Sequence, residues 1–214
     1  HTSIEHGIPL ELRYVDALTR KDAERARSGD RPAGTHGAFN PFLPYDERLF
    51  VADSGPEHVI LLNKFPSIAH HVLLITRAFV DQEAPLAVAD FMAMAHLMAG
   101  MDGIVFFNGG KTGGGSQPHR HYQLLPLPAL PIEAALPQQG IERAQALHVL
   151  PFRHAFMHHH FAPLAPIEAG GTHLFDVFQQ CCECARVVRQ GDKLSPFNLL
   201  LTRKWMMVIP RARE

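Results

Sequence analysis

Short apolar runs alternate with polar and proline-rich segments along most of the chain, and the length of each run indicates the element that it forms. Two runs rich in Val, Ile and Leu occupy residues 58–65 and 71–77. Aliphatic runs of this length, bounded by proline and polar residues, are typical of β-strands. Because residues 66–70 form only a short connection, we predict that the two strands lie side by side.

A longer segment carries apolar residues at helical spacing. Within residues 84–101, Leu86, Ala89, Ala93 and Leu97 recur at intervals of three or four positions. This period is typical of an amphipathic helix with one face buried against a core.

A second predicted helix, over residues 172–190, contains all three cysteines of the chain, Cys181, Cys182 and Cys184. These thiols lie too close together to connect distant parts of a fold, and their spacing is not that of a Cys-x-x-Cys pair. We expect reduced thiols on a helix.

The remaining apolar runs complete a mixed pattern. A glycine-rich loop covers residues 108–117, and residues 136–166 show no clear period. Further strands, the last two of them a closing pair, are predicted over residues 10–15, 103–107, 119–125, 197–202 and 205–209. Since strands and helices alternate without internal repeats or an evident linker, we predict a single α+β domain over residues 1–214.

Composition and charge exclude several classes of partner. The 20 Lys and Arg against 21 Asp and Glu give a formal net charge of −1 over 214 residues, so no long-range attraction to nucleic acid or an anionic membrane is expected. No apolar run approaches the roughly 18 residues that cross a bilayer, and the charged N-terminal segment lacks the apolar core of a leader peptide. We therefore expect a soluble, cytoplasmic protein that binds neither nucleic acid nor membrane.

One predicted strand concentrates polar chemistry. Because side chains alternate across a strand, His119, His121 and Gln123 project from the same face. Just upstream, five of the seven residues from 109 to 115 are glycine, and glycine allows backbone N–H groups to turn toward an anion. The loop and the histidine face are therefore predicted to bind one phosphate between them.

Two familiar phosphate-binding motifs do not fit this loop. Gly110-Lys111-Thr112 matches the end of a P-loop, but Val105 occupies the position of its first glycine and the loop leads into a strand. A dinucleotide fingerprint is interrupted at Pro118, where its third glycine belongs.

Two other interpretations stay open on spacing alone. A metal-binding cupin barrel would begin with Gly113 and the His119-x-His121 pair. Its expected glutamate is missing, because Leu125 and Pro126 occupy the corresponding positions. Alternatively, the two histidines are hydrogen-bonded core residues, which leaves the glycine-rich loop unexplained.

Nucleophilic catalysis at phosphorus uses every part of the segment. A neutral imidazole, with an ordinary pKa of about 6.5, attacks a phosphoryl group and divides a difficult transfer into two displacements. His121, flanked by two polar side chains on its own face, is the predicted nucleophile. His119 would orient it or assist the leaving oxygen, and the Gln123 amide would contact the phosphate that is transferred.

Five blocks along the chain carry the pattern of a known family. They read, in order, Asn40-Pro41-Phe42-Leu43-Pro44, Leu61-Leu62-Asn63-Lys64-Phe65, Phe107-Asn108-Gly109-Gly110, Gly115-Ser116-Gln117-Pro118-His119-Arg120-His121-Tyr122-Gln123, and Asn198-Leu199-Leu200-Leu201-Thr202 with Trp205-Met206-Met207-Val208-Ile209-Pro210-Arg211. From about residue 10 to its end, the chain resembles the histidine-triad (HIT-like) superfamily. Within that superfamily it is similar to the ATP adenylyltransferases, also called diadenosine tetraphosphate (Ap4A) phosphorylases.

The resemblance implies both a fold and a reaction. The fold is an antiparallel HIT-like sheet with flanking helices, related to galactose-1-phosphate uridylyltransferase. The enzyme is a nucleotidyltransferase in which orthophosphate cleaves Ap4A to ATP and ADP through a covalent nucleotidyl-histidine, with the reverse direction also open. His121 matches the nucleophile of the family. The phosphate contacts of the family are matched by Gln123, Asn108, Gly114, Gly115, Ser116 and Gln117. Further candidates lie in other matching blocks: Asn63, Lys64, Thr202, Met207 and Arg211. Lys21 is a candidate from the N-terminal region, which carries little of the family pattern.

The expected partners are small molecules, namely the nucleotides Ap4A, ATP and ADP, together with phosphate. Mg²⁺ is expected to arrive bound to the nucleotide and not in a metal site held by the protein. The protein itself is expected to be a monomer or a homodimer. Candidate cations for the polyphosphate are Lys64, Lys111, Arg203, Lys204 and Arg211.

Departures from the family pattern are small. The loop reads Gly-Gly-Ser-Gln where Gly-Ala-Ser-Gln is frequent, and Arg120 stands where Lys is common, on the side of the strand away from the reacting face. The nearest alternative is an enzyme like the hexose-1-phosphate uridylyltransferases, and another is a non-catalytic nucleotide-binding protein. A metal-ligand role for the triplet of residues 158–160 is disfavoured, because neighbouring residues on a strand point to opposite faces.

Overall fold

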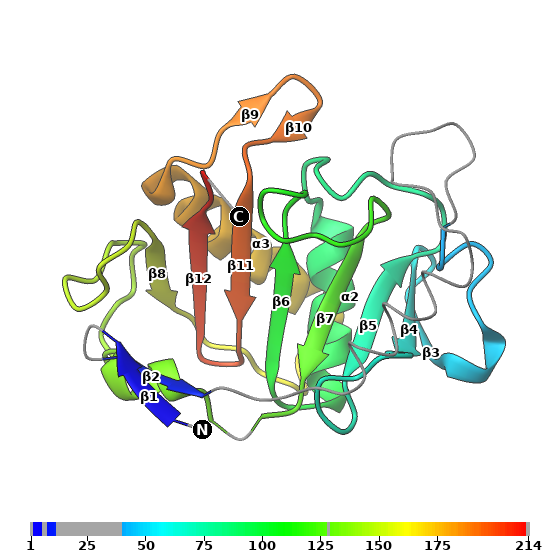
Figure 1. Cartoon of the computed structure of the whole chain (residues 1–214), viewed down its shortest axis with the longest axis horizontal. Coiled ribbons are helices and arrows are strands. Elements are labelled where there is room, and N and C mark those ends of the chain that lie inside the picture. The colour runs from blue at the N-terminus through cyan, green and yellow to red at the C-terminus, as the bar shows by residue number, and fades with distance from the viewer. Residues whose placement is uncertain (1, 6–7, 12–39, 128, 213–214) are drawn as a thin grey trace.

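Eight strands form one antiparallel sheet in the computed structural model, which describes residues 2–5, 8–11, 40–127 and 129–212. The strand order across the sheet is β3-β4-β5-β7-β6-β11-β12-β8, with β7 and β6 in the middle (Figure 1). The strands are β3 (Phe50–Ser54), β4 (His58–Leu62), β5 (Val72–Thr76), β6 (Ile104–Asn108), β7 (His121–Leu125), β8 (Ala155–His158), β11 (Phe197–Leu201) and β12 (Trp205–Pro210).

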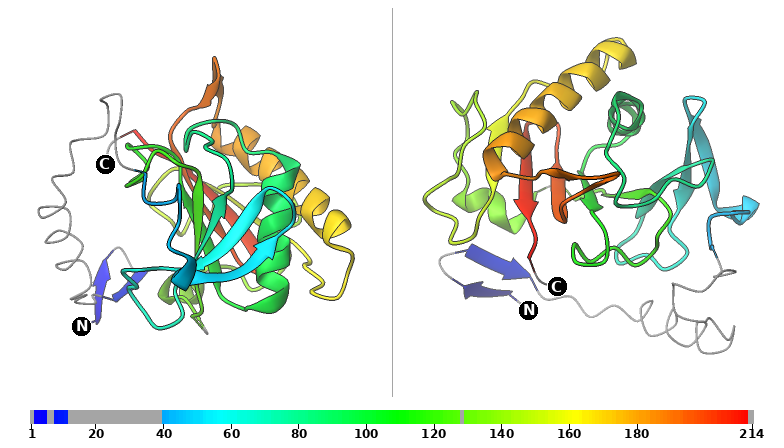
Figure 2. Two further views of the ribbon diagram at one scale, coloured as in Figure 1. Left: turned by 90° about the vertical axis from the view of Figure 1, so that its right-hand side faces the viewer. Right: turned by 90° about the horizontal axis from the view of Figure 1, so that it is seen from above.

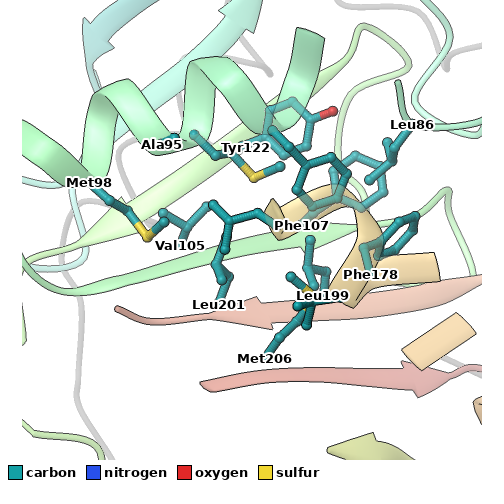
Figure 3. Close-up of a cluster of buried hydrophobic side chains, with 14 of the residues drawn as sticks. Leu86, Ala95, Met98, Val105, Phe107, Tyr122, Phe178, Leu199, Leu201 and Met206 are labelled. Atoms are coloured by element: carbon teal, nitrogen blue, oxygen red, sulfur yellow. The ribbon is translucent and has the colours of Figure 1, made fainter. Parts of the chain in front are cut away.

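Two helices, α2 (Val88–Gly100) and α3 (Ile167–Ala185), cover one face of this sheet (Figure 2). The main hydrophobic core lies between the helices and that face, where alternate strand residues are fully buried. Figure 3 shows part of it, with Val105, Phe107 and Tyr122 from the central strands packed beside Met98 of α2 and Phe178 of α3. No helix in the described part of the chain is long and apolar enough to cross a membrane.

Helix α3 begins at Ile167, five residues before its predicted start. The difference comes from a pair of glycines, Gly170 and Gly171, in its first turns. Glycine usually weakens a helix, but a Cβ on Gly171 would lie only 2.6 Å from the Cα of Met92 in α2. Tight packing of the two helices therefore compensates for the glycine. The helix ends at Ala185, because Arg186 adopts the left-handed conformation with φ of 57°.

The opposite face, turned toward the viewer in Figure 1, is covered at both sides and not in the middle. Over β4 and β5, Phe42 packs on a small cluster that includes Leu73 and Ile75. Over β12 and β8, the short 3₁₀ helix η2 (Pro131–Ala135) and the segment after it bury Trp205 and Met207. Between these covers, Phe106 and Asn108 of β6 and Gln123 of β7 are partly exposed, while His121 is buried beside them with 5% exposure.

Smaller elements lie at the edges. The strands β1 (Thr2–Glu5) and β2 (Ile8–Glu11) form a separate hairpin beside η2, on the face opposite the helices (Figure 2). A second hairpin, β9 (Arg189–Gln190) with β10 (Lys193–Leu194), projects from the end of α3. A 3₁₀ turn, η1 (Glu47–Leu49), leads into β3.

Most predicted elements are confirmed within a few residues. The class is α+β, and the strands predicted over 58–65 and 71–77 pair side by side as β4 and β5. Those predicted over 103–107, 119–125, 197–202 and 205–209 are β6, β7, β11 and β12. The strand predicted over 10–15 overlaps β2 only at residues 10–11, and its remainder lies outside the described residues. Two edge strands of the sheet, β3 and β8, and the hairpins β1–β2 and β9–β10 were missed in whole or in part.

Candidate active site

The central strand β7 presents polar residues on the open face of the sheet and apolar residues on the helix face. Tyr122 and Leu124 are fully buried in the main core, while His121 and Gln123 project to the other side. His119 precedes the strand and is held by an isolated bridge to Asp81. The predicted alternation is therefore confirmed for His121 and Gln123, which share one face.

His121 is held through one ring nitrogen. Its Nδ1 lies 2.8 Å from the carbonyl oxygen of His119. A carbonyl only accepts hydrogen bonds, so Nδ1 carries the proton and Nε2 carries the lone pair. The Phe42 ring packs 5.5 Å from the imidazole, centroid to centroid. The tautomer is thus the one that a nucleophile attacking through Nε2 requires.

His119 uses both of its ring nitrogens inside the protein. Its Nε2 donates to the carbonyl oxygen of Thr76 at 2.8 Å, and its Nδ1 accepts from the side-chain amide of Asn40 at 3.0 Å. The side chain is fully buried, and burial lowers its pKa below the ordinary value, although the bond to Thr76 opposes this. This geometry favours the orienting role over assistance to a leaving oxygen.

Gln123 has a fixed orientation because of His71 on the neighbouring strand. The Nε2 atom of His71 lies 3.1 Å from Oε1 of Gln123, and Nδ1 of His71 is within 3.3 Å of the Ser67 hydroxyl. Since Oε1 accepts from the imidazole, the NH₂ group of Gln123 is left to donate to a ligand. Burial lowers the pKa of His71 and keeps it neutral.

A row of amides continues from the histidines across the sheet. Asn108 and Asn198 are paired in the β6–β11 ladder, and the Asn198 NH₂ group donates to Oδ1 of Asn108 at 2.8 Å and to the carbonyl oxygen of Gly113 at 2.6 Å. Arg211 donates to Oδ1 of Asn198 at 3.0 Å. The end of β12 is thereby connected to the glycine-rich loop.

The backbone amides of the glycine-rich loop were predicted to face an anion. In the structure, several of them form hydrogen bonds within the loop instead. The amides of Gly114 and Gly115 donate to the carbonyl oxygens of Lys111 and Gly110, so they are not turned toward a phosphate as predicted. Gly114 has φ of 86°, and a Cβ on Gly115 would lie 2.8 Å from the Gly110 oxygen. In the described structure, the amides of the next two residues, Ser116 and Gln117, are not used in this way.

The block with Asn63 and Lys64 lies beside His71. The Asn63 amide contacts the ring of His71 at 3.2 Å, so Asn63 supports the residue that orients Gln123. Lys64 is exposed and lies 5.5 Å from the centre of the Phe65 ring. Lys21 lies outside the described residues.

The structure places two of the predicted nucleotide-binding residues away from the histidines. Met207 is fully buried among Phe156 and Trp205, beneath the segment that contains η2. Thr202 is also buried, and its hydroxyl bonds to the backbone of Trp205 in the β11–β12 turn, at the end of the sheet opposite the glycine-rich loop (Figure 1). Neither side chain lies on the open part of the sheet over β6 and β7. The sequence could not show this, because the periodicity of a strand does not reveal which segment covers it.

The other candidate cations differ in position. Arg203 donates to the carbonyl oxygen of Met98 at the end of α2, so it caps a helix and does not face the site. Lys204 is in the same turn as Thr202, whereas Lys111 is exposed on the glycine-rich loop.

Arg120 points to the helix side, as expected, and donates to the buried carboxylate of Asp90 at 3.0 Å. In the triplet, His158 is tied to the carbonyl oxygen of Pro137 at 3.0 Å. The described residues contain no group of three or more His, Cys, Asp or Glu side chains arranged to hold a metal ion. They also contain no disulfide, since all three cysteines are free.

Four further residues of the site were not predicted. Gln82 bonds to the backbone of His121, His71 orients Gln123, Asn40 binds His119, and Asn198 links the loop to β12. Two of them belong to blocks that carry the family pattern, but single amides and a histidine next to another histidine have no distinctive spacing.

Two family models match the chain, one after the other. The Ap4A phosphorylase N-terminal domain model matches residues 1–143, and the ATP adenylyltransferase C-terminal domain model matches residues 148–214. Strands β3 to β7 belong to the first part and β8, β11 and β12 to the second, so the sheet joins the two.

Two curated proteins of Saccharomyces cerevisiae are similar to the chain. Diadenosine 5',5'''-P1,P4-tetraphosphate phosphorylase 2 is 28% identical over 207 residues, covering 82% of this chain and 62% of the relative. Protein APA1 is 26% identical over 240 residues, covering 97% and 70%. The chain therefore spans 62% of the length of the first of these relatives.

Solved structures give the same relationship. Yeast Ap4A phosphorylase Apa2 in complex with Ap4A matches with a TM-score of 0.63 and 25% identity, over 81% of this chain and 64% of that one. Its complex with AMP matches with a TM-score of 0.65 and 26% identity, over 81% and 63%. A uridylyltransferase structure shares the fold, with a TM-score of 0.50 and 14% identity over 85% and 83%. Because the two family models together account for nearly its whole length, the chain belongs to the Ap4A phosphorylase family.

Proposed function

We propose that this protein transfers the adenylyl group of Ap4A to orthophosphate through His121, producing ATP and ADP. One observation carries the proposal. His121 is locked through Nδ1 by the His119 carbonyl, on the same sheet face as a Gln123 amide whose NH₂ group is presented by His71. A nucleophile and a donor for the transferring phosphate are therefore held side by side before any ligand binds.

The reaction consists of two displacements. In the first, Nε2 of His121 attacks the α-phosphorus of one adenosine, the bond from that phosphorus to its bridging oxygen breaks, and the remainder leaves as ATP. In the second, an oxygen of orthophosphate attacks the same phosphorus, the phosphorus–nitrogen bond breaks, and ADP is released. The reverse sequence makes Ap4A from ATP and ADP.

Charge on the transferring group is stabilised by fixed donors. The Gln123 NH₂ group and the amides of Ser116 and Gln117 are the candidates, and one well-placed donor contributes roughly 3–4 kcal/mol to such reactions in other enzymes. Lys64, Lys111 and Arg211 supply positive charge near the polyphosphate. Mg²⁺ enters as part of the nucleotide substrate. A cytoplasmic location and a monomeric or homodimeric state stay predictions.

Labelling at the histidine tests this proposal. The protein is mixed with Ap4A that carries ³²P at the α-phosphorus, in the absence of orthophosphate. We expect an acid-labile, base-stable label on the peptide containing His121, with release of ATP, and conversion of the label to ADP when phosphate is added. The variant His121→Asn should bind Ap4A and form no label.

The alternatives give other results in the same assay. A uridylyltransferase-like enzyme, favoured only by the shared fold, would take label from a UDP-sugar and not from Ap4A. A nucleotide-binding protein without catalytic activity would bind Ap4A and form no label at all. Labelling that persists in His121→Asn would reject the assignment of the nucleophile.

A further inference from the structure

The ladder between β6 and β7 stops short of the nucleophile. It pairs Ile104 with Leu125 and Phe106 with Gln123. Two residues further along this register, Asn108 of β6 would stand opposite His121 of β7. In an antiparallel sheet, alternate opposite pairs exchange N–H and C=O hydrogen bonds directly. The N–H and C=O groups of His121 both face the side chain that also bonds to the Asn108 carbonyl oxygen, as expected for a pair of the bonded kind.

The side chain of Gln82 takes the place of that exchange. Its Oε1 accepts from the backbone N–H of His121 at 2.8 Å, and its Nε2 donates to the His121 carbonyl oxygen at 3.2 Å. The same Nε2 donates to the Asn108 carbonyl oxygen at 2.9 Å. One carboxamide therefore bridges the two strands where the nucleophile begins β7 and the glycine-rich loop leaves β6.

Gln82 is itself rigid. Only 2% of the residue is exposed, and its backbone N–H donates to the Pro118 carbonyl oxygen at 2.8 Å. Two positions earlier, the Val80 carbonyl oxygen accepts from the N–H of Arg120 at 2.8 Å. The segment that carries Gln82 thus runs alongside the histidine segment and is bonded to it through the backbone.

The chemistry of the amide matches its surroundings. One acceptor meets an N–H group and two donors meet two carbonyl oxygens, which is the full complement of donors that a glutamine offers. A carboxylate offers no donor to the two carbonyl oxygens, and an apolar side chain leaves all three buried backbone groups unsatisfied.

We propose that Gln82 is a positioning residue for the nucleophile, which sets the place of the His121 imidazole by inserting its carboxamide between β6 and β7. The proposal rests on the function proposed above. Gln82 fixes the backbone of His121, and the His119 carbonyl fixes the ring on that backbone. Displacement of a nucleophile by about 1 Å can slow a reaction about 10²-fold.

The central test compares Gln82→Met with the parent protein. Methionine keeps the length of the side chain and removes all three hydrogen bonds. We expect adenylylation of His121 by α-labelled Ap4A to slow about 10²-fold, while the dissociation constant for Ap4A changes less than about threefold, because the phosphate and nucleoside contacts stay. A variant that forms the label at the parental rate overturns the proposal.

A control outside the site is available at Gln138, an exposed glutamine. Its amide also donates to two carbonyl oxygens, those of Glu133 and Leu136, but it lies beside η2 and away from the histidines. Gln138→Met should label at the parental rate. Equal slowing in Gln138→Met and Gln82→Met would overturn the positioning role and assign both effects to general loss of stability.

The variant Gln82→Glu adds a readout that loss of stability would not produce. The ionised carboxylate repels the two carbonyl oxygens, whereas the protonated carboxyl group again donates to one of them and accepts from His121. The ratio of its labelling rate to that of the parent should therefore rise about tenfold between about pH 8 and about pH 5.5. A ratio that is constant over this range counts against the proposal.

Failure of the proposed function is separable from failure of this inference. If the parent itself forms no label, the function falls, and the ¹⁵N shifts of the His121 ring, assigned by their loss in His121→Asn, still test the positioning. Shifts that move in Gln82→Met support a positioned imidazole. Shifts that stay unchanged overturn it.

Discussion

At the scale of single residues, hydrogen bonding distinguishes histidines that the sequence presents as equal. The chain has 15 of them. His119 uses both ring nitrogens inside the protein and His71 donates to Gln123, so both act on neighbours. His121 is anchored at Nδ1 by the His119 carbonyl oxygen, which fixes the tautomer with the proton on Nδ1. The partners that set the tautomers of His119 and His71 are far away in the sequence, whereas the partner of the His121 ring is only two residues away.

One half-buried histidine outside the site, His159, has both ring nitrogens shielded from solvent and predicts how stability varies with pH. Burial, together with the neighbouring His173 imidazole, lowers the pKa of His159 to about 4 from 6.5. Because the unfolded chain takes up this proton first, stability is highest above pH 6.5 and falls as the pH drops toward 4. Between pH 7 and pH 4.5, His159 should account for a loss of up to about 3 kcal/mol in the free energy of unfolding.

Denaturant unfolding at the two pH values measures this loss. His159→Leu should lose less stability than the parent over the interval, while the exposed neighbour in His160→Leu should leave the loss unchanged. Equal losses in the parent and in His159→Leu would contradict the prediction.

At the scale of elements, the contact between α2 and α3 gives two adjacent glycines, Gly170 and Gly171, different surroundings. A Cβ on Gly170 would have no heavy atom nearer than 3.7 Å, whereas one on Gly171 would lie 2.4 Å from Cγ of Met92. Gly170→Ala should therefore stabilise the protein by roughly 0.5–1 kcal/mol through helix propensity. Gly171→Ala should destabilise it by about 1–3 kcal/mol through overpacking.

Thermal or denaturant unfolding of the two variants checks this prediction, and each serves as the control for the other. Changes of the same sign would contradict the close approach of the helices at Gly171.

The glycine-rich loop shows why composition alone misdirected part of the site prediction. Its glycines suggested a ring of amides turned toward a phosphate. In the structure, the amides of Gly114 and Gly115 bond within the loop. A Cβ at Gly113 would lie 2.6 Å from the Gly109 carbonyl oxygen, so glycine is needed there for backbone packed on backbone. A glycine that faces a ligand and one that faces its own loop look alike in sequence.

At the scale of the whole molecule, the coverage of the open face decides which strand residues can meet a ligand. Phe106 and Met207 belong to the same row across the sheet, through Leu200. Phe106 is partly exposed next to Gln123, whereas Met207 is fully buried beneath the segment that contains η2. One end of this row, Phe106, therefore lies at the candidate site, and the other end, Met207, lies in a hydrophobic cluster.

Substitution of Met207 should mainly affect stability, whereas substitution of Phe106 should mainly affect KM. Met207→Ala should reduce the free energy of unfolding by about 2–5 kcal/mol and leave KM for Ap4A unchanged in the folded protein. Under the proposed function, Phe106→Ala should raise KM for Ap4A, because it removes apolar surface next to Gln123 on the open face, with a smaller loss of stability. A raised KM in Met207→Ala would contradict this prediction and show that Met207 contributes to nucleotide binding.

The sequence by itself determined the alternation of strands and helices, the single face shared by His121 and Gln123, and the family. These depend on local periods and on contiguous blocks of residues, which are visible without the fold. Only the tertiary structure decided that Met207 and Thr202 are covered, that His71 orients Gln123, and that Gln82 bridges β6 and β7. The burial of Met207 and the bonds of His71 and Gln82 are contacts between segments far apart in the chain, and no local pattern of polar and apolar residues encodes them.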